Sequence, residues 1–188
     1  DAAKIKGGKV IVRRAEEGEK FVTLDGVGRT LNAADLMIAN AEKPMCLAGV
    51  FGGEESGVTE STVNVFLESA YFNPVSIRKT SKRHTLKTDA SFRYERGCDP
   101  DVTLYALKRA ALLITEIAGG EIVGDVVDIV SAPVEKKVVE LDYARIQRFI
   151  GKEIGVQTIK DILGYLEMEF VSESETGCVV KVPTYRVD

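Results

Sequence analysis

Residues 73–96 carry the largest concentration of charge that could do chemistry. This stretch holds seven basic side chains against two acidic ones, a net charge of +5, whereas the whole chain has a net charge of −4. A basic segment on an otherwise acidic chain can contact the phosphates of a nucleic acid, although a solvated helix face would show the same composition. The residues expected to contact a nucleic acid are Arg78, Lys79, Lys82, Arg83 and Lys87.

Glu68 is the second candidate, because it stands inside the apolar run VNVFLESA at residues 63–70. This run predicts a buried strand, and a buried carboxylate is costly unless it is paired or receives a hydrogen bond. The residues alone leave two partners open. One is a basic side chain from the segment that follows, and the other is a ligand hydroxyl.

His84, Thr88 and Ala90 lie close together in KRHTLKTDAS. His84 could act as a general base with Asp89 nearby, but a single histidine also fits a structural or surface residue. No GxSxG motif supports a serine triad. Thr88 or Asp89 is expected to cap a helix. An alanine at position 90 indicates a binding site only if a pocket there requires a small side chain.

The loop GGEESG at residues 52–57 has two interpretations. It matches neither the P-loop pattern nor GxGxxG, and its two acids would repel a phosphate. It therefore predicts either a tight turn between strands or a pocket wall whose backbone N–H groups are free of side chains.

The elements that must position these residues are short strands followed by helices. Strands are predicted at residues 10–12, 21–31 (a hairpin turning at Leu24-Asp25-Gly26), 36–39, 45–50 and 121–130. Helices are predicted from Asn73-Pro74 to residue 82, and from Asp99-Pro100, with Asp99 as the N-cap, to Gly119-Gly120.

A second, smaller pattern follows Ser131-Ala132-Pro133. It predicts a strand at residues 138–141, a helix at 143–150 capped by Asp142 and stopped by Gly151, and a hairpin of residues 169–174 and 178–182. A second helix is indicated by the stripe of Ile159, Ile162, Leu163 and Leu166. Two helices and a two-stranded wing form a winged-helix-like outline.

Composition limits the class of protein. With 45% hydrophobic and 29% charged residues among 188, the chain can form a core and is not disordered as a whole. No apolar run approaches the roughly 18 residues of a membrane helix, and three widely spaced cysteines are expected to stay reduced. One histidine and no CxxC make a zinc site unexpected. The sequence opens at Asp1 and closes on VPTYRVD, so we expect a piece of a longer chain.

Three strings, GVFGGEESGV, FLESAYFNPVSIRKTSKRH and KTDASFRYERGCDP, closely resemble the β subunit of bacterial-type phenylalanyl-tRNA synthetase. The resemblance covers nearly the whole chain. It implies an α+β fold in which residues 1–131 form an N-terminally truncated, β-rich B3/B4 editing domain with packed helices. Residues 134–188 would then be a C-terminally truncated, winged-helix-like B5 domain.

The resemblance also implies a function. Such proteins take part in charging tRNA(Phe), and their B3/B4 domain hydrolyses tyrosyl-tRNA(Phe), because an apolar pocket rejects one extra hydroxyl only weakly. Aminoacylation itself, with ATP and Mg²⁺, belongs to the full synthetase, and no cofactor is expected in this piece. The implied partners are the tRNA(Phe) acceptor end, the α subunit of an α2β2 heterotetramer, and tyrosine and phenylalanine, in the cytoplasm without a membrane.

The family's editing residues carry over by the resemblance. Glu68 matches the glutamate that recognises the tyrosine hydroxyl, and Thr88 and His84 complete the set expected at the catalytic site, His84 without an assigned step. The residues expected to line the substrate pocket with Glu68 are Ala48, Gly49, Gly52 and Ala90.

Three departures from the family pattern stand out. Thr85 replaces the glycine usual after the histidine, and a family histidine would lie just before Asp1. Asp188 matches the first of several acids that hold magnesium in B5, but one carboxylate is too few for a site, so no bound metal is expected.

Two other functions remain open from the sequence. The chain could be a non-catalytic scaffold that binds tRNA and the α subunit. A DNA-binding winged helix is opposed by the absence of a marked basic excess in residues 134–188.

Overall fold

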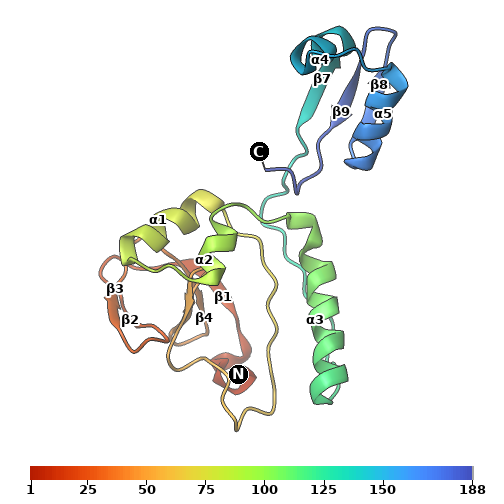
Figure 1. The fold of residues 1–188 in the computed structure, drawn as a ribbon. Helices are drawn as coiled ribbons and strands as arrows, with labels where there is room; N and C mark the ends of the chain where they lie inside the picture. The colour runs from red at the N-terminus through yellow and green to blue at the C-terminus, as the bar shows by residue number, and fades with distance from the viewer. Residues whose placement is uncertain (188) are drawn as a thin grey trace. The chain divides into compact units, whose positions relative to one another are not determined.

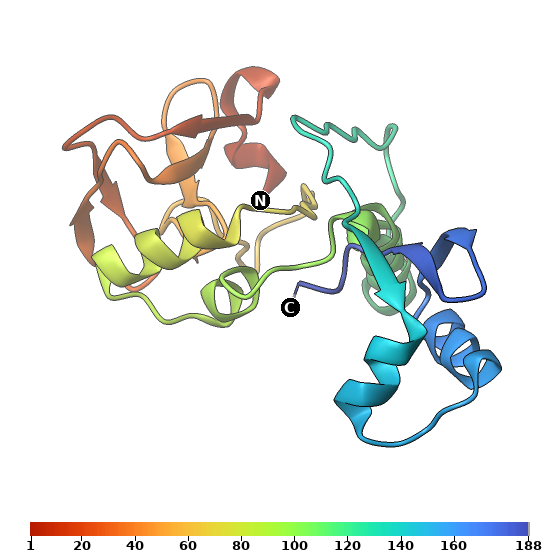
Figure 2. The same ribbon diagram turned by 90° about the horizontal axis from the view of Figure 1, so that it is seen from above.

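The structure is a computed structural model that describes residues 1–187. The chain forms two compact units (Figures 1 and 2). The first unit comprises Asp1–Cys98 and Val102–Asp125, and the second comprises Asp99–Asp101 and Val126–Asp188. Residues 119–137, which include the predicted domain boundary, contain neither helix nor strand. No helix in the described chain has the length and apolar character needed to cross a bilayer.

The first unit is built on two small antiparallel sheets. The four-stranded sheet has the order β1-β4-β5-β6 and consists of β1 (Ile11–Arg14), β4 (Leu36–Ala39), β5 (Pro44–Leu47) and β6 (Phe51–Gly52). The predicted hairpin is confirmed as β2 (Lys20–Val22) and β3 (Gly28–Thr30), joined through Gly26 at φ 72°. A bridge between Thr23 and Gly53 links the two sheets. Two 3₁₀ turns, η1 (Ala2–Lys4) and η2 (Lys6–Gly8), precede β1.

Two predicted strands are wrong. Residues 63–70 and 121–130 join no sheet within residues 1–187 (Figure 1). Both are apolar, yet Val63 is 88% and Val123 82% exposed. A β-rich run becomes a strand only where a neighbouring edge supplies hydrogen bonds and a face to pack on, and these runs meet no such edge.

The predicted helices of the first unit are confirmed, with one change at a start. Asn73 caps α1 (Pro74–His84), and its side chain accepts a hydrogen bond from the Ser76 N–H at 3.1 Å. The helix α2 (Asp89–Tyr94) begins at the N-cap Thr88. Asp99 instead holds a 3₁₀ turn, η3 (Pro100–Val102), before α3 (Thr103–Ala118), which ends at Gly119.

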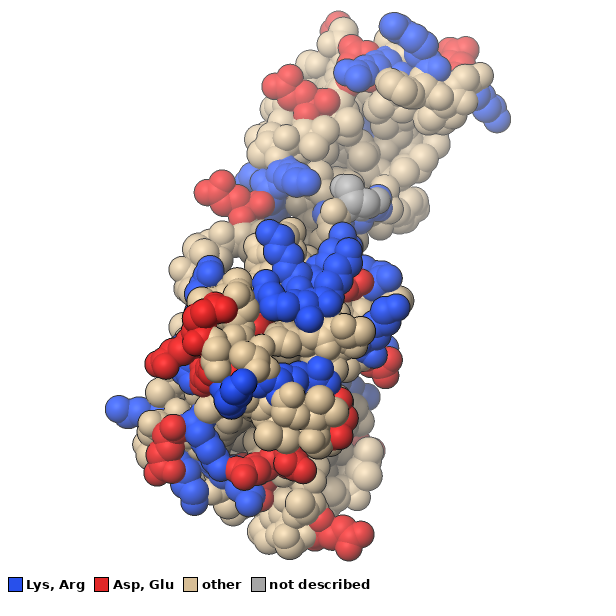
Figure 3. Space-filling view, turned by 90° about the vertical axis from the view of Figure 1, so that its left-hand side faces the viewer, with Lys and Arg blue, Asp and Glu red and all other residues tan. Residues whose placement is uncertain are grey.

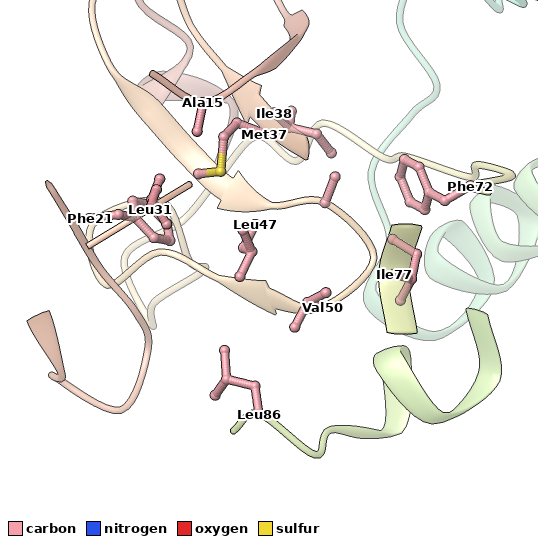
Figure 4. Close-up of a cluster of buried hydrophobic side chains, with 11 residues drawn as sticks. Ala15, Phe21, Leu31, Met37, Ile38, Leu47, Val50, Phe72, Ile77 and Leu86 are labelled. Atoms are coloured by element: carbon pink, nitrogen blue, oxygen red, sulfur yellow. The ribbon is translucent and has the colours of Figure 1, made fainter. Parts of the chain in front are cut away.

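The hydrophobic core of the first unit packs α1 against the four-stranded sheet. Met37 and Leu47 from adjacent strands are fully buried, as is Ile77 from α1 at 1% exposure. Figure 4 shows Ile77 and Phe72 at one end of this cluster and Phe21 and Leu31 at the other. The segments after the sheet are therefore fixed against it by apolar burial.

The second unit confirms the winged-helix-like outline. It contains β7 (Val138–Asp142), α4 (Tyr143–Ile150), α5 (Val156–Tyr165), β8 (Glu169–Glu173) and β9 (Gly177–Lys181), with the sheet order β7-β9-β8. Asp142 caps α4 and Gly151 ends it, as predicted. Gly177 is required because a Cβ there would lie 2.1 Å from the Leu141 carbonyl oxygen.

The apolar stripe of α5 is only partly buried. Ile159 is 4% exposed and packs with Tyr143 and Val180, and Leu163 lies at the edge of this cluster. Ile162 is 46% exposed, so the stripe that indicated the helix is not buried along its whole length.

Candidate active site

The turn at residues 48–50, between β5 and β6, is the point on which most of the predicted pocket residues converge. Ala48 and Val50 are each 1% exposed and are tied back by hydrogen bonds to Leu36 and Leu47. Gly49 between them has φ +66°, and a Cβ there would lie 2.8 Å from the Phe72 ring. The turn therefore needs a glycine for both its backbone conformation and its packing.

The N–H of Gly49 differs from its neighbours in the turn. The N–H groups of Ala48 and Val50 donate to backbone carbonyls at 2.9 and 3.0 Å. Within residues 1–187, the Gly49 N–H has no hydrogen-bond acceptor. Gly49 is half-buried, and a backbone donor without an acceptor in such a place is costly, so this N–H is a candidate partner for an oxygen atom of a bound molecule.

Gly52 follows in β6, where it pairs with Cys46 of β5. A Cβ on Gly52 would lie 2.8 Å from Leu24 Cδ1, and a Cβ on Gly53 would lie 2.6 Å from the Met45 carbonyl oxygen. Close packing against the β2–β3 hairpin and β5 therefore explains both glycines, which agrees with the interpretation of the GGEESG loop as a tight turn.

Thr88 joins α2 to this turn. Its hydroxyl donates to the Val50 carbonyl oxygen at 2.6 Å and accepts from the Ser91 N–H at 3.0 Å. The Ser91 hydroxyl in turn accepts from the Thr88 N–H, which completes a capping box. The Thr88 hydroxyl proton is thus engaged with the Val50 carbonyl oxygen, and this hydrogen bond holds the start of α2 against the turn.

Ala90 and Tyr94 lie one helical turn apart on α2 and so share a face. Ala90 is half-buried. The Tyr94 ring meets Phe72 edge to face, with centroids 5.0 Å apart, and Phe72 packs on Gly49. Ala90 thus lies on the helix face that carries Tyr94. We call Gly49, Phe72 and Tyr94, together with Ala90 on this face, the aromatic wall.

Glu68 lies beside this wall, in an environment that differs from the prediction. The residue is exposed and belongs to no strand, so the predicted buried strand is wrong. Surrounding protein nevertheless raises the pKa of its carboxyl by desolvation. Burial chiefly raises the pKa of the Cys46 thiol to about 12, and the negative charge of Glu68 adds to this effect. Burial and the charge of Glu68 likewise raise the pKa of Tyr94.

The Glu68 carboxylate has no partner in the part of the chain that the structure describes. Neither a hydrogen bond nor an ion pair joins it to any side chain or backbone group of residues 1–187. The alternative in which a basic residue of the following segment pairs with Glu68 is therefore wrong. What remains is a partly dehydrated acceptor next to an aromatic wall.

His84 lies apart from this cluster. Its Nε2 is 2.7 Å from Oδ2 of Asp35, a fully buried residue just before β4, so the predicted pairing with Asp89 is wrong. Burial by itself would raise the pKa of Asp35. Hydrogen bonds from the Asn32 N–H, His84 and Thr80 outweigh that effect and hold the pKa below its usual value. Thr85, after the helix, adopts a left-handed φ of 56°, the conformation that favours glycine.

The basic residues of α1 form one exposed face. Arg78, Lys79, Lys82 and Arg83 are exposed, while Ile77, Thr80 and Ser81 on the other side of the helix are buried. Lys87 is exposed in the segment that follows, and α1 has no acidic residue. Figure 3 shows Lys and Arg side chains gathered on this side of the molecule. We call these five residues the basic face.

Comparison with known proteins identifies the family. The model of the B3/4 domain matches residues 1–119, and that of the tRNA synthetase B5 domain matches residues 139–188. A phenylalanine–tRNA ligase beta subunit from Bacteroides fragilis is 56% identical over all 188 residues. The chain belongs to the family of phenylalanine–tRNA ligase beta subunits.

Other members of this family match the chain over its full length. The beta subunit of Bacteroides thetaiotaomicron is 53% identical, and that of Bdellovibrio bacteriovorus is 48% identical. The chain spans 23% of the length of these beta subunits. A solved N-terminal fragment of the phenylalanyl-tRNA synthetase beta subunit from Pyrococcus horikoshii is 16% identical, with a TM-score of 0.44. That match covers 99% of this chain and 53% of the fragment.

Several residues at the candidate site were not predicted from the sequence. Phe72 and Tyr94 complete the aromatic wall, Cys46 adjoins Glu68, and Asp35 binds His84. Asp35 had a sequence signal, since it is a lone acid directly before the apolar strand LMIA. The aromatic rings had none, because only the tertiary fold brings them to residue 49.

Two further features lie away from this cluster. A cavity of about 710 Å³ is lined by none of the predicted site residues, and includes the lysines Lys4, Lys6, Lys20 and Lys43. The predicted magnesium ligand Asp188 lies outside the described residues. Among residues 1–187, no three acidic, histidine or cysteine side chains are grouped so as to hold a metal.

Proposed function

We propose that the first unit hydrolyses tyrosine from mischarged tyrosyl-tRNA(Phe), as the editing part of a phenylalanine–tRNA ligase beta subunit. The observation that carries this proposal is the Glu68 carboxylate, which is partly desolvated beside the aromatic wall and has no partner within residues 1–187. A phenolic hydroxyl would give Glu68 the donor it lacks, and phenylalanine would not. Sites that hydrogen-bond a substrate hydroxyl discriminate strongly against the analogue without it.

The remaining residues position the aminoacyl ester. The ring lies against Phe72 and Tyr94 where Ala90 leaves room, and Ala48 and Gly52 belong to the hairpin that carries the turn. The Gly49 N–H, which has no acceptor in the described chain, is the group we assign to the oxyanion that forms when water attacks the ester carbonyl. A ribose hydroxyl of the terminal adenosine assists that water.

Thr88 and His84 act in this mechanism by holding elements in place. The Thr88 hydroxyl is engaged with Val50 and Ser91, and His84 with Asp35. Orientation and oxyanion stabilisation, worth several kcal/mol each, then replace a protein nucleophile.

The basic face (Arg78, Lys79, Lys82, Arg83 and Lys87) binds the tRNA acceptor end. In the complete cytoplasmic synthetase, an α2β2 heterotetramer, the α subunit carries out aminoacylation with ATP and Mg²⁺. The chain's own residues supply only binding and editing.

The complete α–β enzyme tests this proposal directly. We expect tyrosine to be released from tyrosyl-tRNA(Phe) at least about tenfold faster than phenylalanine from phenylalanyl-tRNA(Phe), since a hydrogen bond to a charged group is worth about 1.5–3 kcal/mol. The measurement is the release of labelled amino acid under single-turnover conditions. Equal rates for the two esters would refute the proposed specificity.

One observation favours a non-catalytic scaffold as the alternative. The two polar residues expected at the catalytic site, Thr88 and His84, are both bound to protein groups. A scaffold would bind tRNA through the basic face while leaving tyrosyl-tRNA(Phe) intact.

The basic face gives a prediction common to both functions. Changing Lys79 and Lys82 to Glu in the complete enzyme should raise the KM for tRNA and lower the slope of log KM against log salt. The slope should fall by about 0.7–0.9 for each phosphate that the variant no longer neutralises. Lys152→Glu, at an exposed position in the second unit, is the matched control. An unchanged slope in the double variant would place the RNA-binding surface elsewhere.

A further inference from the structure

Asp35 is a fully buried carboxylate whose side-chain partners all come from the last turns of α1. Its Oδ1 accepts from the Thr80 hydroxyl at 2.8 Å and pairs with the Arg83 guanidinium. Its Oδ2 faces His84 Nε2 at 2.7 Å and accepts from the backbone N–H of Asn32 at 2.9 Å. Positions 80, 83 and 84 lie on one helical face, so a single carboxylate holds that face.

A second group fixes the same helix end. Arg29 of β3 donates to the His84 carbonyl oxygen at 2.9 Å, which satisfies one of the carbonyls left free at a helix C-terminus. The Arg29 side chain is itself held by Thr23 and Asp25 at 2.8 Å each. The end of α1 is therefore clamped from the β2–β3 hairpin as well as from Asp35.

The clamped end lies four residues before the proposed pocket. After His84 the chain turns through Thr85 in a left-handed conformation and reaches Thr88, whose hydroxyl binds Val50. Ala90 follows in the first turn of α2. Where α1 ends thus determines whether Thr88 reaches the turn and where Ala90 stands in the aromatic wall.

We propose that Asp35 is a positioning residue of the editing site: its carboxylate fixes the end of α1 and, through residues 85–88, places the aromatic wall and directs Arg83. The inference rests on the proposed function. This role requires a carboxylate at position 35, because the NH₂ group of an asparagine would face two of the groups that now donate hydrogen bonds to Asp35. A buried donor left unsatisfied is costly, so the helix end would move.

The test uses the complete α–β enzyme with Asp35→Asn, Thr88→Val and the double variant. We expect Asp35→Asn to lower kcat for tyrosine release at least roughly tenfold, because small misplacements near a reacting ester are costly. The kcat for phenylalanine charging should change by less than about twofold, because aminoacylation does not depend on the aromatic wall. The double variant should be no slower than the slower single variant, since both changes release the same segment.

A purely structural role would give a different result. Asp35→Asn would then lower the melting temperature while leaving kcat for tyrosine release unchanged below that temperature. Alternatively, the losses in kcat caused by Asp35→Asn and Thr88→Val would multiply in the double variant. Either outcome overturns the inference. If Asp35→Asn does not fold, Thr80→Val removes one donor from the same carboxylate. It should show a smaller loss with the same non-additivity, and additive losses would again overturn the inference.

The proposed function and the clamp can fail separately. If the wild-type enzyme does not release tyrosine faster than phenylalanine, the proposed function is wrong. The clamp is then judged by hydrogen exchange, which should speed up at residues 85–90 in Asp35→Asn and stay unchanged in a control such as Glu60→Gln, at an exposed position. Unchanged exchange in Asp35→Asn would overturn it.

Discussion

Glu68→Ala should abolish the preference of the complete enzyme for tyrosyl-tRNA(Phe). The carboxylate has no partner within residues 1–187, so the variant loses only the acceptor for the substrate hydroxyl. A hydrogen bond to a charged group is worth about 1.5–3 kcal/mol, so tyrosine release should slow about 10- to 100-fold. Release of phenylalanine should hardly change. The measurement is the ratio of the two single-turnover rates.

Glu60→Ala is the matched control for this variant. Glu60 lies exposed in the same connection between β6 and α1, and its replacement should leave both rates as they are. If Glu68→Ala behaved like Glu60→Ala, the hydroxyl would be recognised by another group.

The pH dependence of the wild-type preference provides a second readout. Desolvation raises the pKa of Glu68, so its carboxylate becomes protonated at a higher pH than an ordinary glutamate, whose pKa is about 4.3. As the pH is lowered, the preference for tyrosine should therefore begin to fall at a pH above the ordinary glutamate pKa. In Glu68→Gln the preference should not change over this pH range.

The same shift fixes the sign of a stability effect. A raised pKa in the folded state means that the ionised form opposes folding, so its cost is absent below the unfolded pKa and complete above the folded pKa. At neutral pH, Glu68→Gln should melt at a higher temperature than the wild type. The difference should vanish on acidification below about 4.

Ala90→Trp should remove tyrosine release while phenylalanine charging continues. Ala90 shares its helix face with Tyr94, whose ring meets Phe72, so an indole would occupy the space we assign to the substrate ring. We expect a loss of at least about 100-fold, because overfilling a packed site displaces the substrate altogether. Release of tyrosine and charging with phenylalanine are measured on the same preparation.

Two comparisons make the result specific. Ala106→Trp puts the same bulk on an exposed position of α3 and should leave editing intact. Ala90→Gly keeps the space open and should retain most of the activity. Unchanged tyrosine release in Ala90→Trp would move editing elsewhere and leave this chain as a scaffold.

The sequence determined the helix ends well wherever it contains capping or helix-terminating residues. Asn73-Pro74, Thr88 and Asp142 mark helix starts, and all three are N-caps in the structure. Gly151 marks a helix end for a local reason, since it adopts a left-handed conformation. Such signals need only neighbouring residues, so a sequence read by itself contains them.

The strings around the GGEESG loop also determined the family, and with it a set of site residues to examine. They did not determine the environment of those residues. The run around Glu68 has the composition of a buried strand, yet it joins no sheet in the described chain. Strand formation depends on a partner edge elsewhere in the chain, so composition predicted it wrongly.

Only the tertiary structure decided which side chains meet. It paired His84 with Asp35, 49 positions away in the sequence, in place of Asp89. It placed Phe72 against Gly49 and Tyr94 against Phe72, and it left Glu68 partly desolvated with no protein partner among residues 1–187. Contacts between distant residues and the loss of water around a carboxylate are properties of the packed chain, because both arise only when separate segments are brought together.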